Sequence, residues 1–109
     1  MGDYKPVSNM SVRGEDTAKQ CVIFLEGQFD TAAAAEHSER LLAMLDSPLN
    51  EVVIDAGKLT YLASAGIRTL LLMLKKAKAS GKALQLKSLQ PMVRDVLEMT
   101  GMLGLFKVT

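Results

Sequence analysis

The chain has 109 residues, of which 49% are hydrophobic and 23% are charged, a composition typical of one globular domain and not of a disordered segment. Its 13 basic and 12 acidic residues leave a net charge of +1, so charge provides no argument for nucleic-acid binding. With one Cys and one His, the chain can form neither an internal disulfide nor a Cys/His zinc site of its own.

A hairpin and a helix are expected in the first part of the chain. Weak apolar alternation over Tyr4–Val12 predicts a first strand. The polar stretch Arg13–Lys19 predicts a turn, and Cys21–Gly27 is a β-rich run that would pair with the first strand. Asp30 then precedes an Ala-rich helix that we expect to end near residue 45, because an N-cap carboxylate accepts the free N–H groups of a first helical turn.

Strands and helices are expected to alternate in the rest of the chain. Glu51–Asp55 is short and β-branched, as buried parallel strands are. Ser64–Ala79 predicts a helix, since apolar residues recur at three- and four-residue spacing, namely Ile67, Leu70, Leu71, Leu74 and Ala77. A strand over Ala83–Lys87, a helix beginning at Pro91 and a last strand over Leu105–Val108 follow. This order predicts a single α/β domain over residues 1–109, with a mixed sheet of about four to five strands that is parallel where helices make the crossovers.

We find no group of reactive side chains typical of an enzyme. The sequence contains no Gly-x-Ser-x-Gly elbow and no Walker loop. The neighbours of His37 are charged or polar, which favours a solvated surface side chain. Cys21 begins an apolar strand, and a buried free Cys usually behaves as a small hydrophobe. We therefore expect a non-enzymatic protein with no cofactor and no bound metal.

Sequence signals for a membrane or for secretion are missing as well. No apolar run approaches the roughly 18 residues that span a bilayer. The first ten residues lack the apolar core of a secretory signal. We expect a cytoplasmic protein that does not insert into a membrane, and a monomer or weak dimer.

Five lysines in the second half of the chain have no acidic residue among them: Lys75, Lys76, Lys78, Lys82 and Lys87. Cations near the C-terminus of a helix complement its dipole and keep the surface soluble, which is the interpretation we favour. Contact with an anionic partner or a membrane surface is the alternative.

The helix start at Ser64 has two interpretations. Ser is a preferred N-cap that contributes about 1 kcal/mol, and Gly66 would then serve close packing. Alternatively, Ser64 is a phosphorylation site. The free N–H groups and the dipole of a helix start favour an anion, and a phosphate adds about −1.5 to −2 charges. The small neighbours Ala63, Ala65 and Gly66 would leave the hydroxyl accessible to another protein.

Three segments resemble STAS domains, and most closely the free-standing anti-sigma factor antagonists of bacteria. LEGQFD at Leu25–Asp30 is similar to the family's strand that ends before the first helix. VVIDAGKLTYLASAGIRTLL at Val52–Leu71 resembles its strand, loop and Ser-x-Gly helix start, and Ser88–Val108 resembles its proline-led third helix and closing strand. The resemblance implies a STAS-like α/β fold with helices packed mainly on one face of the sheet.

The resemblance also implies a partner-switching cycle. The unmodified antagonist binds an anti-sigma factor that is a serine kinase of the GHKL type. Phosphorylation of the antagonist separates the two, and a PP2C-type phosphatase resets the cycle. Ser64 lies at the position of the family's phosphorylated serine, and Asp30 matches an acidic residue near it. Four residues and the glycine would flank the contact with the partner: Thr60, Ala63, Ala65, Gly66 and Arg68.

The chain departs from the family pattern at two places. Many members have Asp where this chain has Ala63, and some have a second hydroxyl where it has Ala65. Many also continue beyond the position of Thr109 into a last helix, so we expect part of the sheet or of the third helix to be more exposed. Two alternative functions remain: an accessory subunit of a membrane lipid transporter, or a signalling scaffold. In either, Ser64 would be only a helix cap.

Overall fold

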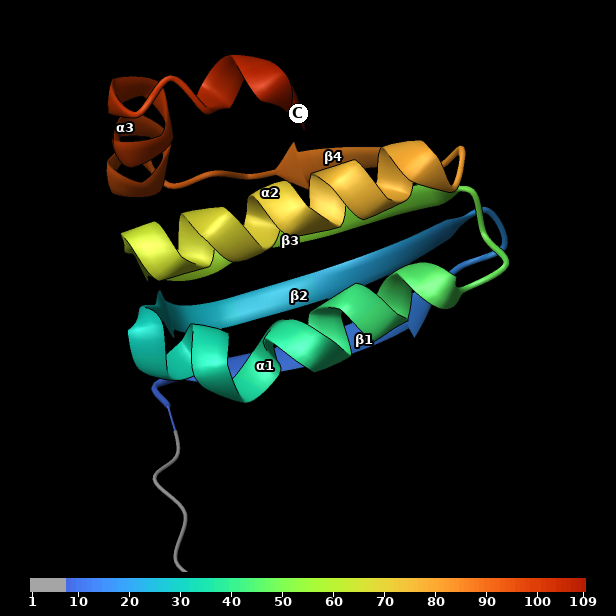
Figure 1. Cartoon of the computed structure of the whole chain (residues 1–109), viewed down its shortest axis with the longest axis horizontal. Helices are drawn as coiled ribbons and strands as arrows, with labels where there is room; N and C mark the ends of the chain where they lie inside the picture. Colours follow the sequence, from blue (N-terminus) through green and yellow to red (C-terminus); the bar gives the residue numbers. More distant parts are fainter. Residues whose placement is uncertain (1–7) are drawn as a thin grey trace, which may run out of the picture.

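A computed structural model describes residues 8–109 and contains one mixed sheet (Figure 1). Its five strands are β1 (Met10–Asp16), β2 (Gln20–Phe29), β3 (Glu51–Leu62), β4 (Ala83–Lys87) and β5 (Lys107–Val108). They lie side by side in chain order. β1 is antiparallel to β2, whereas every later pair is parallel. This confirms the predicted mixed sheet.

Each parallel connection contains a helix. The helices are α1 (Thr31–Ala43), α2 (Ser64–Ala79) and α3 (Pro91–Met99), with short 3₁₀ turns η1 (Met44–Asp46) and η2 (Leu103–Leu105). α1 and α2 lie next to each other across the same face of the sheet, and α3 lies at the end of the sheet where both of them begin (Figure 1). Because successive crossovers move to the next strand in one direction and are right-handed, they bring the helices to one face.

The core lies between the sheet and α1 and α2. Alternate residues of β2 point toward the helices, so Cys21, Ile23 and Leu25 are buried. Burial raises the pKa of the Cys21 thiol, and a hydrogen bond with Asp16 adds to the effect. The thiol therefore stays protonated at neutral pH and behaves as the small hydrophobe that was predicted.

β1 lies later in the chain than predicted. The expected strand Tyr4–Val12 begins among residues outside the described part, and β1 runs from Met10 to Asp16 through the segment predicted as a turn. The turn is confined to residues 17–19, where the Thr17 hydroxyl oxygen accepts hydrogen bonds from the Lys19 and Gln20 amides. β1 is an edge strand, and charged residues protect such edges from pairing with other chains. The same charged residues are common in turns, which is why the segment was predicted as a turn.

β3 is also longer than the predicted strand Glu51–Asp55. Its second half stays paired with β2 as far as Phe29↔Leu62, through two register shifts. β4 pairs only with the first five residues of β3. α3 packs beside the remaining part, and the Gln90 side-chain amide donates to the Gly57 carbonyl at 2.8 Å. The long β3 therefore carries the start of α2 to the end of the sheet.

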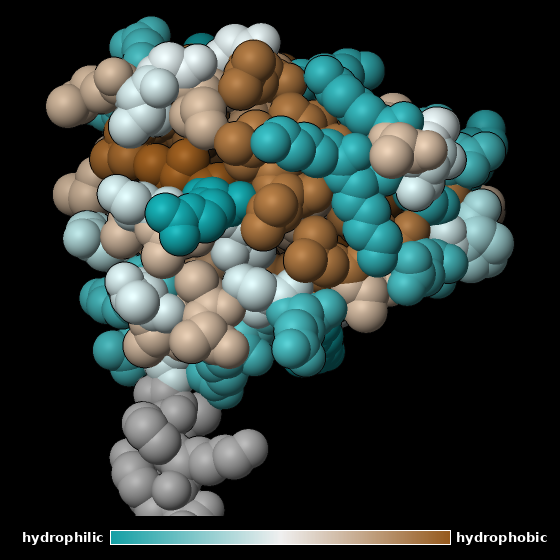
Figure 2. Space-filling view, in the orientation of Figure 1, coloured by the Kyte–Doolittle hydropathy of each residue, from teal (hydrophilic) through white to brown (hydrophobic). Residues whose placement is uncertain are grey.

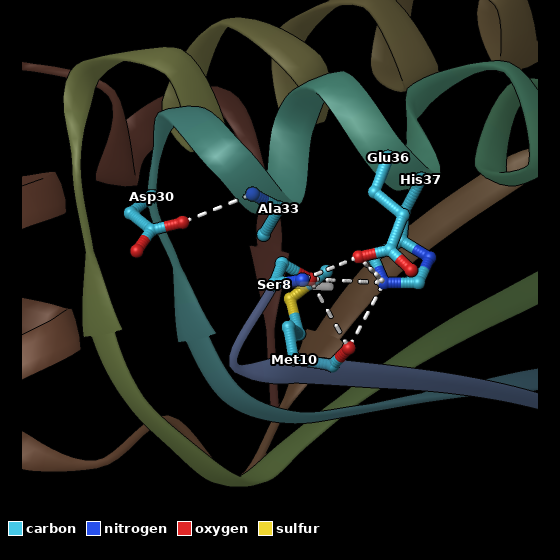
Figure 3. A network of polar contacts seen from close by, with 6 residues as sticks. All are labelled: Ser8, Met10, Asp30, Ala33, Glu36 and His37. Atoms are coloured by element: carbon cyan, nitrogen blue, oxygen red, sulfur yellow. Dashed lines mark hydrogen bonds and ion pairs between the residues drawn. The ribbon is translucent and has the colours of Figure 1, made fainter. Parts of the chain in front are cut away.

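The prediction of a solvated His37 is wrong. Its side chain is only 12% exposed and lies against the beginning of β1 (Figure 3). Nε2 is 2.9 Å from the Met10 carbonyl oxygen and 3.4 Å from the Ser8 hydroxyl. Because a carbonyl oxygen can only accept, Nε2 carries the hydrogen and donates it. His37 thus connects α1 to the edge strand.

Two of the five lysines also have structural roles. Lys76 Nζ donates to the Leu42 carbonyl oxygen at 2.7 Å and lies 3.1 Å from the Asp46 carboxylate. Lys82 Nζ donates to the Leu49 and Ser47 carbonyl oxygens. Lys76 satisfies a carbonyl of the last turn of α1, and Lys82 satisfies two carbonyls of the connection between α1 and β3, which would otherwise need water.

Candidate partner-binding site

Ser64 is the first helical residue of α2 and not its cap. Ala63 occupies the N-cap position, with extended dihedral angles (φ −100°, ψ 173°) and no side-chain hydrogen bond. The predicted N-cap role of Ser64 is therefore wrong, because the N-cap is the residue that directly precedes the first helical turn, and that residue is Ala63. Ala63 is instead held by its backbone, since its N–H donates to the Phe29 carbonyl at 2.9 Å.

The Ser64 hydroxyl is exposed and has no hydrogen-bond partner within residues 8–109. The amides of Ser64, Ala65 and Gly66 have no acceptor in the same part of the chain. The first turn of α2 contains no acidic residue. A free hydroxyl thus lies at the uncompensated positive end of a helix dipole.

Asp30 is the N-cap of α1, as predicted. Its Oδ1 accepts a hydrogen bond from the Ala33 amide at 2.9 Å (Figure 3). Phe29 and Leu62 are paired at the ends of β2 and β3, so the chain enters α1 and α2 from adjacent strands. Asp30 and Ser64 therefore lie at the same end of the sheet, where the two helices begin (Figure 1).

Gly66 is buried beneath the helix start. A Cβ at this position would lie 2.7 Å from the Phe29 carbonyl oxygen and 2.8 Å from the Phe29 ring. Only a residue without a side chain allows the first turn of α2 to lie this close to the end of β2. Gly66 therefore determines how far Ser64 stands from the sheet.

The remaining predicted residues lie around this helix start. Thr60 is exposed near the end of β3, and its hydroxyl donates to the Gly27 carbonyl at 3.1 Å. Ala65 is half-buried, and Arg68 is exposed one turn after Ser64. Arg68 forms no ion pair within residues 8–109.

Tyr61 was not among the predicted site residues, yet its side chain is 46% exposed just before α2. In the sequence it stands between Leu59 and Leu62, which are both buried. A polar-tipped aromatic residue between two interior leucines was the signal that could have pointed to it. Tyr61 is an aromatic surface residue in a chain with 5% aromatic residues, and such side chains are enriched in binding interfaces.

The described residues contain no group of three or more His, Cys, Asp or Glu side chains that could hold a metal ion. Within the same range, no helix is long and apolar enough to cross a membrane.

Comparisons with known proteins agree with this fold. Residues 12–107 match the family model described as "Mlab, STAS domain". Among curated proteins, the chain is 38% identical over 84 residues to "Putative anti-sigma factor antagonist BtrV" of Bordetella bronchiseptica, covering 77% of this chain and 72% of that protein.

Solved structures of anti-sigma factor antagonists have the same fold. One from Mycobacterium paratuberculosis matches with a TM-score of 0.81 at 20% identity, over 91% of this chain and 84% of that chain. Unphosphorylated SpoIIAA matches with a TM-score of 0.76 at 19% identity, over 91% and 88%. The phosphorylated form of SpoIIAA from Bacillus matches with a TM-score of 0.69 at 18% identity, over 91% of both chains. The chain therefore belongs to the STAS domain family, among the anti-sigma factor antagonists.

Proposed function

We propose that this protein is the antagonist in a partner-switching pathway and that Ser64 is its switch. The unphosphorylated chain binds a GHKL-type anti-sigma factor that is also a serine kinase, and this frees the sigma factor. Phosphorylation of Ser64 releases the kinase, and a PP2C-type phosphatase restores binding. The observation that carries the proposal is the exposed, unbonded Ser64 hydroxyl at the first residue of α2.

The position of Ser64 suits phosphoryl transfer without refolding. The Ser64 oxygen would form a bond to the γ-phosphorus of ATP as the β–γ bridge breaks, and its proton would be lost as ADP leaves. The new group carries about −1.5 to −2 charges. Since α2 begins with free amides and no acidic residue, its dipole favours this charge, typically by about 0.3–1 kcal/mol. A partner would thus sense a change of surface charge.

The flanking residues have separate parts in this proposal. Asp30, Thr60, Ala63, Ala65 and Arg68 contribute to the surface that the partner contacts, while Gly66 sets its depth. Asp30 already uses one carboxylate oxygen as the α1 cap, so its side chain serves both the fold and the docking surface. SpoIIAA, whose structure is known in a phosphorylated and an unphosphorylated form, supports reversible modification by analogy of fold.

The first test is the intact mass and site mapping of the protein recovered from its native cells. We expect a phosphate on Ser64 under some growth conditions. Binding is then measured by calorimetry against the GHKL-type kinases of the same genome, with phosphoserine installed at position 64. We expect one kinase to bind the unmodified chain and to lose affinity for the phosphorylated one.

Ser80→Ala is the matched control for Ser64→Ala. Ser80 is an exposed serine at the other end of α2. We expect Ser64→Ala to bind the kinase in the presence of ATP without being released, and Ser80→Ala to behave as the wild type. A chain that stays unmodified under all conditions, with full coverage of Ser64 and no kinase bound, would refute the switch. Co-purification with a transporter subunit or a large particle would then support the accessory-subunit or scaffold alternative.

A further inference from the structure

The outward face of α2 carries a continuous surface that begins at Ser64. Residues 64, 68, 71 and 75 follow the i, i+4, i+7, i+11 spacing that places side chains in one line along a helix. Ser64, Arg68 and Lys75 are exposed and Leu71 is half-buried, while Leu72 beside them is 44% exposed. We call these five residues the α2 strip.

The charge of α2 has one sign only. It contains four basic residues and no acidic one. Lys76 is used within the fold by Asp46 and the Leu42 carbonyl. Arg68, Lys75 and Lys78 form no ion pair with any residue of the described range 8–109. The α2 strip therefore presents two unpaired cations, with a third just beyond it.

Apolar surface lies between these cations. Figure 2 shows hydrophobic atoms gathered over the middle of α2, with long hydrophilic side chains beside them. In the part of the chain that the structure describes, Leu72 is one of five large hydrophobic residues with high exposure. Apolar contacts surrounded by fixed charges of one sign are typical of a helix-binding surface with a charged rim.

We propose that the α2 strip binds an amphipathic helix of the partner with acidic residues flanking its apolar face. The partner's apolar residues would cover Leu71 and Leu72. Its carboxylates would pair with Arg68 and Lys75, which are two helical turns or roughly 10.5 Å apart along the axis. This inference rests on the proposed function for the identity of the partner, because the strip begins at the residue that the kinase modifies. A second copy of this chain is not the occupant, since its own α2 strip is equally basic and like charges repel.

The same surface explains how one phosphate could release the partner. A phosphate on Ser64 would lie one turn from Arg68, at the i, i+4 spacing at which opposite charges attract on a helix. It would compete with the partner's carboxylate for Arg68 and repel that carboxylate directly. Release would then require no movement of the backbone.

The test uses two synthetic helical peptides and the full ¹⁵N-labelled chain. The peptides share one leucine stripe, and the residues that flank it are Glu in one and Lys in the other. We expect the Glu peptide to shift the amide signals of residues 64–79. The double variant Arg68→Gln/Lys75→Gln, and separately phosphoserine installed at position 64, should each weaken its binding by about tenfold or more. Lys87→Gln, an exposed lysine of β4, should bind the Glu peptide as the wild type does.

Several results would overturn the inference. One is binding of the Lys peptide as tight as that of the Glu peptide, and another is amide shifts that lie outside α2. A third is binding to vesicles of phosphatidylcholine and phosphatidylglycerol that depends on Arg68 and Lys75, without binding of the Glu peptide, which would make a membrane the occupant. The two proposals fail separately. Phosphate on Ser64 in cells with no peptide bound to α2 removes only the docking inference. Conversely, the Glu peptide could bind and be weakened by installed phosphoserine although the chain is never phosphorylated in cells. That result removes only the switch.

Discussion

The N-cap of α2 is Ala63, whose methyl side chain occupies a position where most helices have a side chain that accepts a hydrogen bond. Ala63 has the extended backbone of an N-cap but no capping side chain, so the amides at the start of α2 have no acceptor among residues 8–109. The uncapped start reduces the stability of α2 and leaves the positive end of its dipole open to an added anion.

Ala63→Asp should therefore stabilise the protein by about 0.5–2 kcal/mol, because it supplies the missing cap. Ser64→Ala should change the stability by less than about 0.5 kcal/mol, since the Ser64 hydroxyl makes no hydrogen bond within the described range. Urea denaturation of both variants measures these differences. A loss of more than 1 kcal/mol in Ser64→Ala, on the scale of about one lost cap, would mean that Ser64 caps the helix in solution after all.

Gly66 is the residue at which the helix start has no room for a side chain. Gly66→Ala should cost about 1–3 kcal/mol, because its Cβ would meet the Phe29 backbone and ring at less than 3 Å. Gly104→Ala is the control, as a Cβ there meets nothing within 4 Å. Equal stability of the two variants in denaturant titrations would show that α2 can move away from β2.

Cys21 gives a pH dependence with a defined sign. Burial, and then the Asp16 hydrogen bond, raises the pKa of its thiol in the folded state. The folded protein thus holds this proton more tightly than the unfolded chain does. This difference in proton binding contributes fully to the free energy of unfolding at neutral pH. The contribution decreases as the pH rises through the alkaline range. We expect a thiol reagent at pH 8 to modify the native protein much more slowly than the urea-unfolded protein, and equal rates would contradict the buried position.

Among the elements, α2 and β4 have the predicted bounds, whereas β1 and β3 do not. α2 and β4 carry regular periodicities that end at clear stop signals. β1 is an edge strand whose polar residues imitate a turn. β3 continues past Asp55 through register shifts, and no local pattern marks pairing with a strand that lies some thirty residues earlier in the chain. The same long-range pairing brings Asp30 and Ser64 to one end of the sheet. The resemblance implied this placement, whereas the spacing along the chain does not predict it.

The buried face of α2 is also slightly rotated from the predicted one. Leu70 is 2% exposed, and Met73 is fully buried, but Leu71 is only half-buried. Leu70→Ala should cost about 2–5 kcal/mol, the usual range for a core leucine, whereas Leu71→Ala should cost less than half as much. Thermal unfolding monitored by circular dichroism compares the two. A larger loss in Leu71→Ala would place the α2 strip partly inside the core.

Across the whole molecule, stability is distributed unevenly along the sheet. β2 and β3 are central, long and paired on both sides over part of their length. β5 consists of two residues at the far edge, although the Thr109 amide still donates to the Leu86 carbonyl at 2.8 Å. Contacts thus decrease from the middle of the sheet to its edges.

Native-state hydrogen exchange should follow this distribution. Amides of β2 and β3 should exchange only with global unfolding, while those of residues 107–109 should exchange through local opening with a much smaller free energy. Exchange near β1 should accelerate in His37→Ala, because that side chain donates to the Met10 carbonyl. Uniform protection over all five strands would indicate that the sheet opens as a single unit.

The isolation of the Ser64 hydroxyl from the interior has a consequence for how such a protein can change over generations. A group that makes no internal contact can be modified without breaking any bond of the fold, so the proposed phosphorylation of Ser64 and the folding of the chain place largely separate demands on the sequence. Substitutions in the core then act mainly on folding and those on the outward face of α2 mainly on partner choice, whereas Asp30 and Gly66 serve both. A duplicated copy could acquire a new partner through a few surface changes while it keeps the same interior.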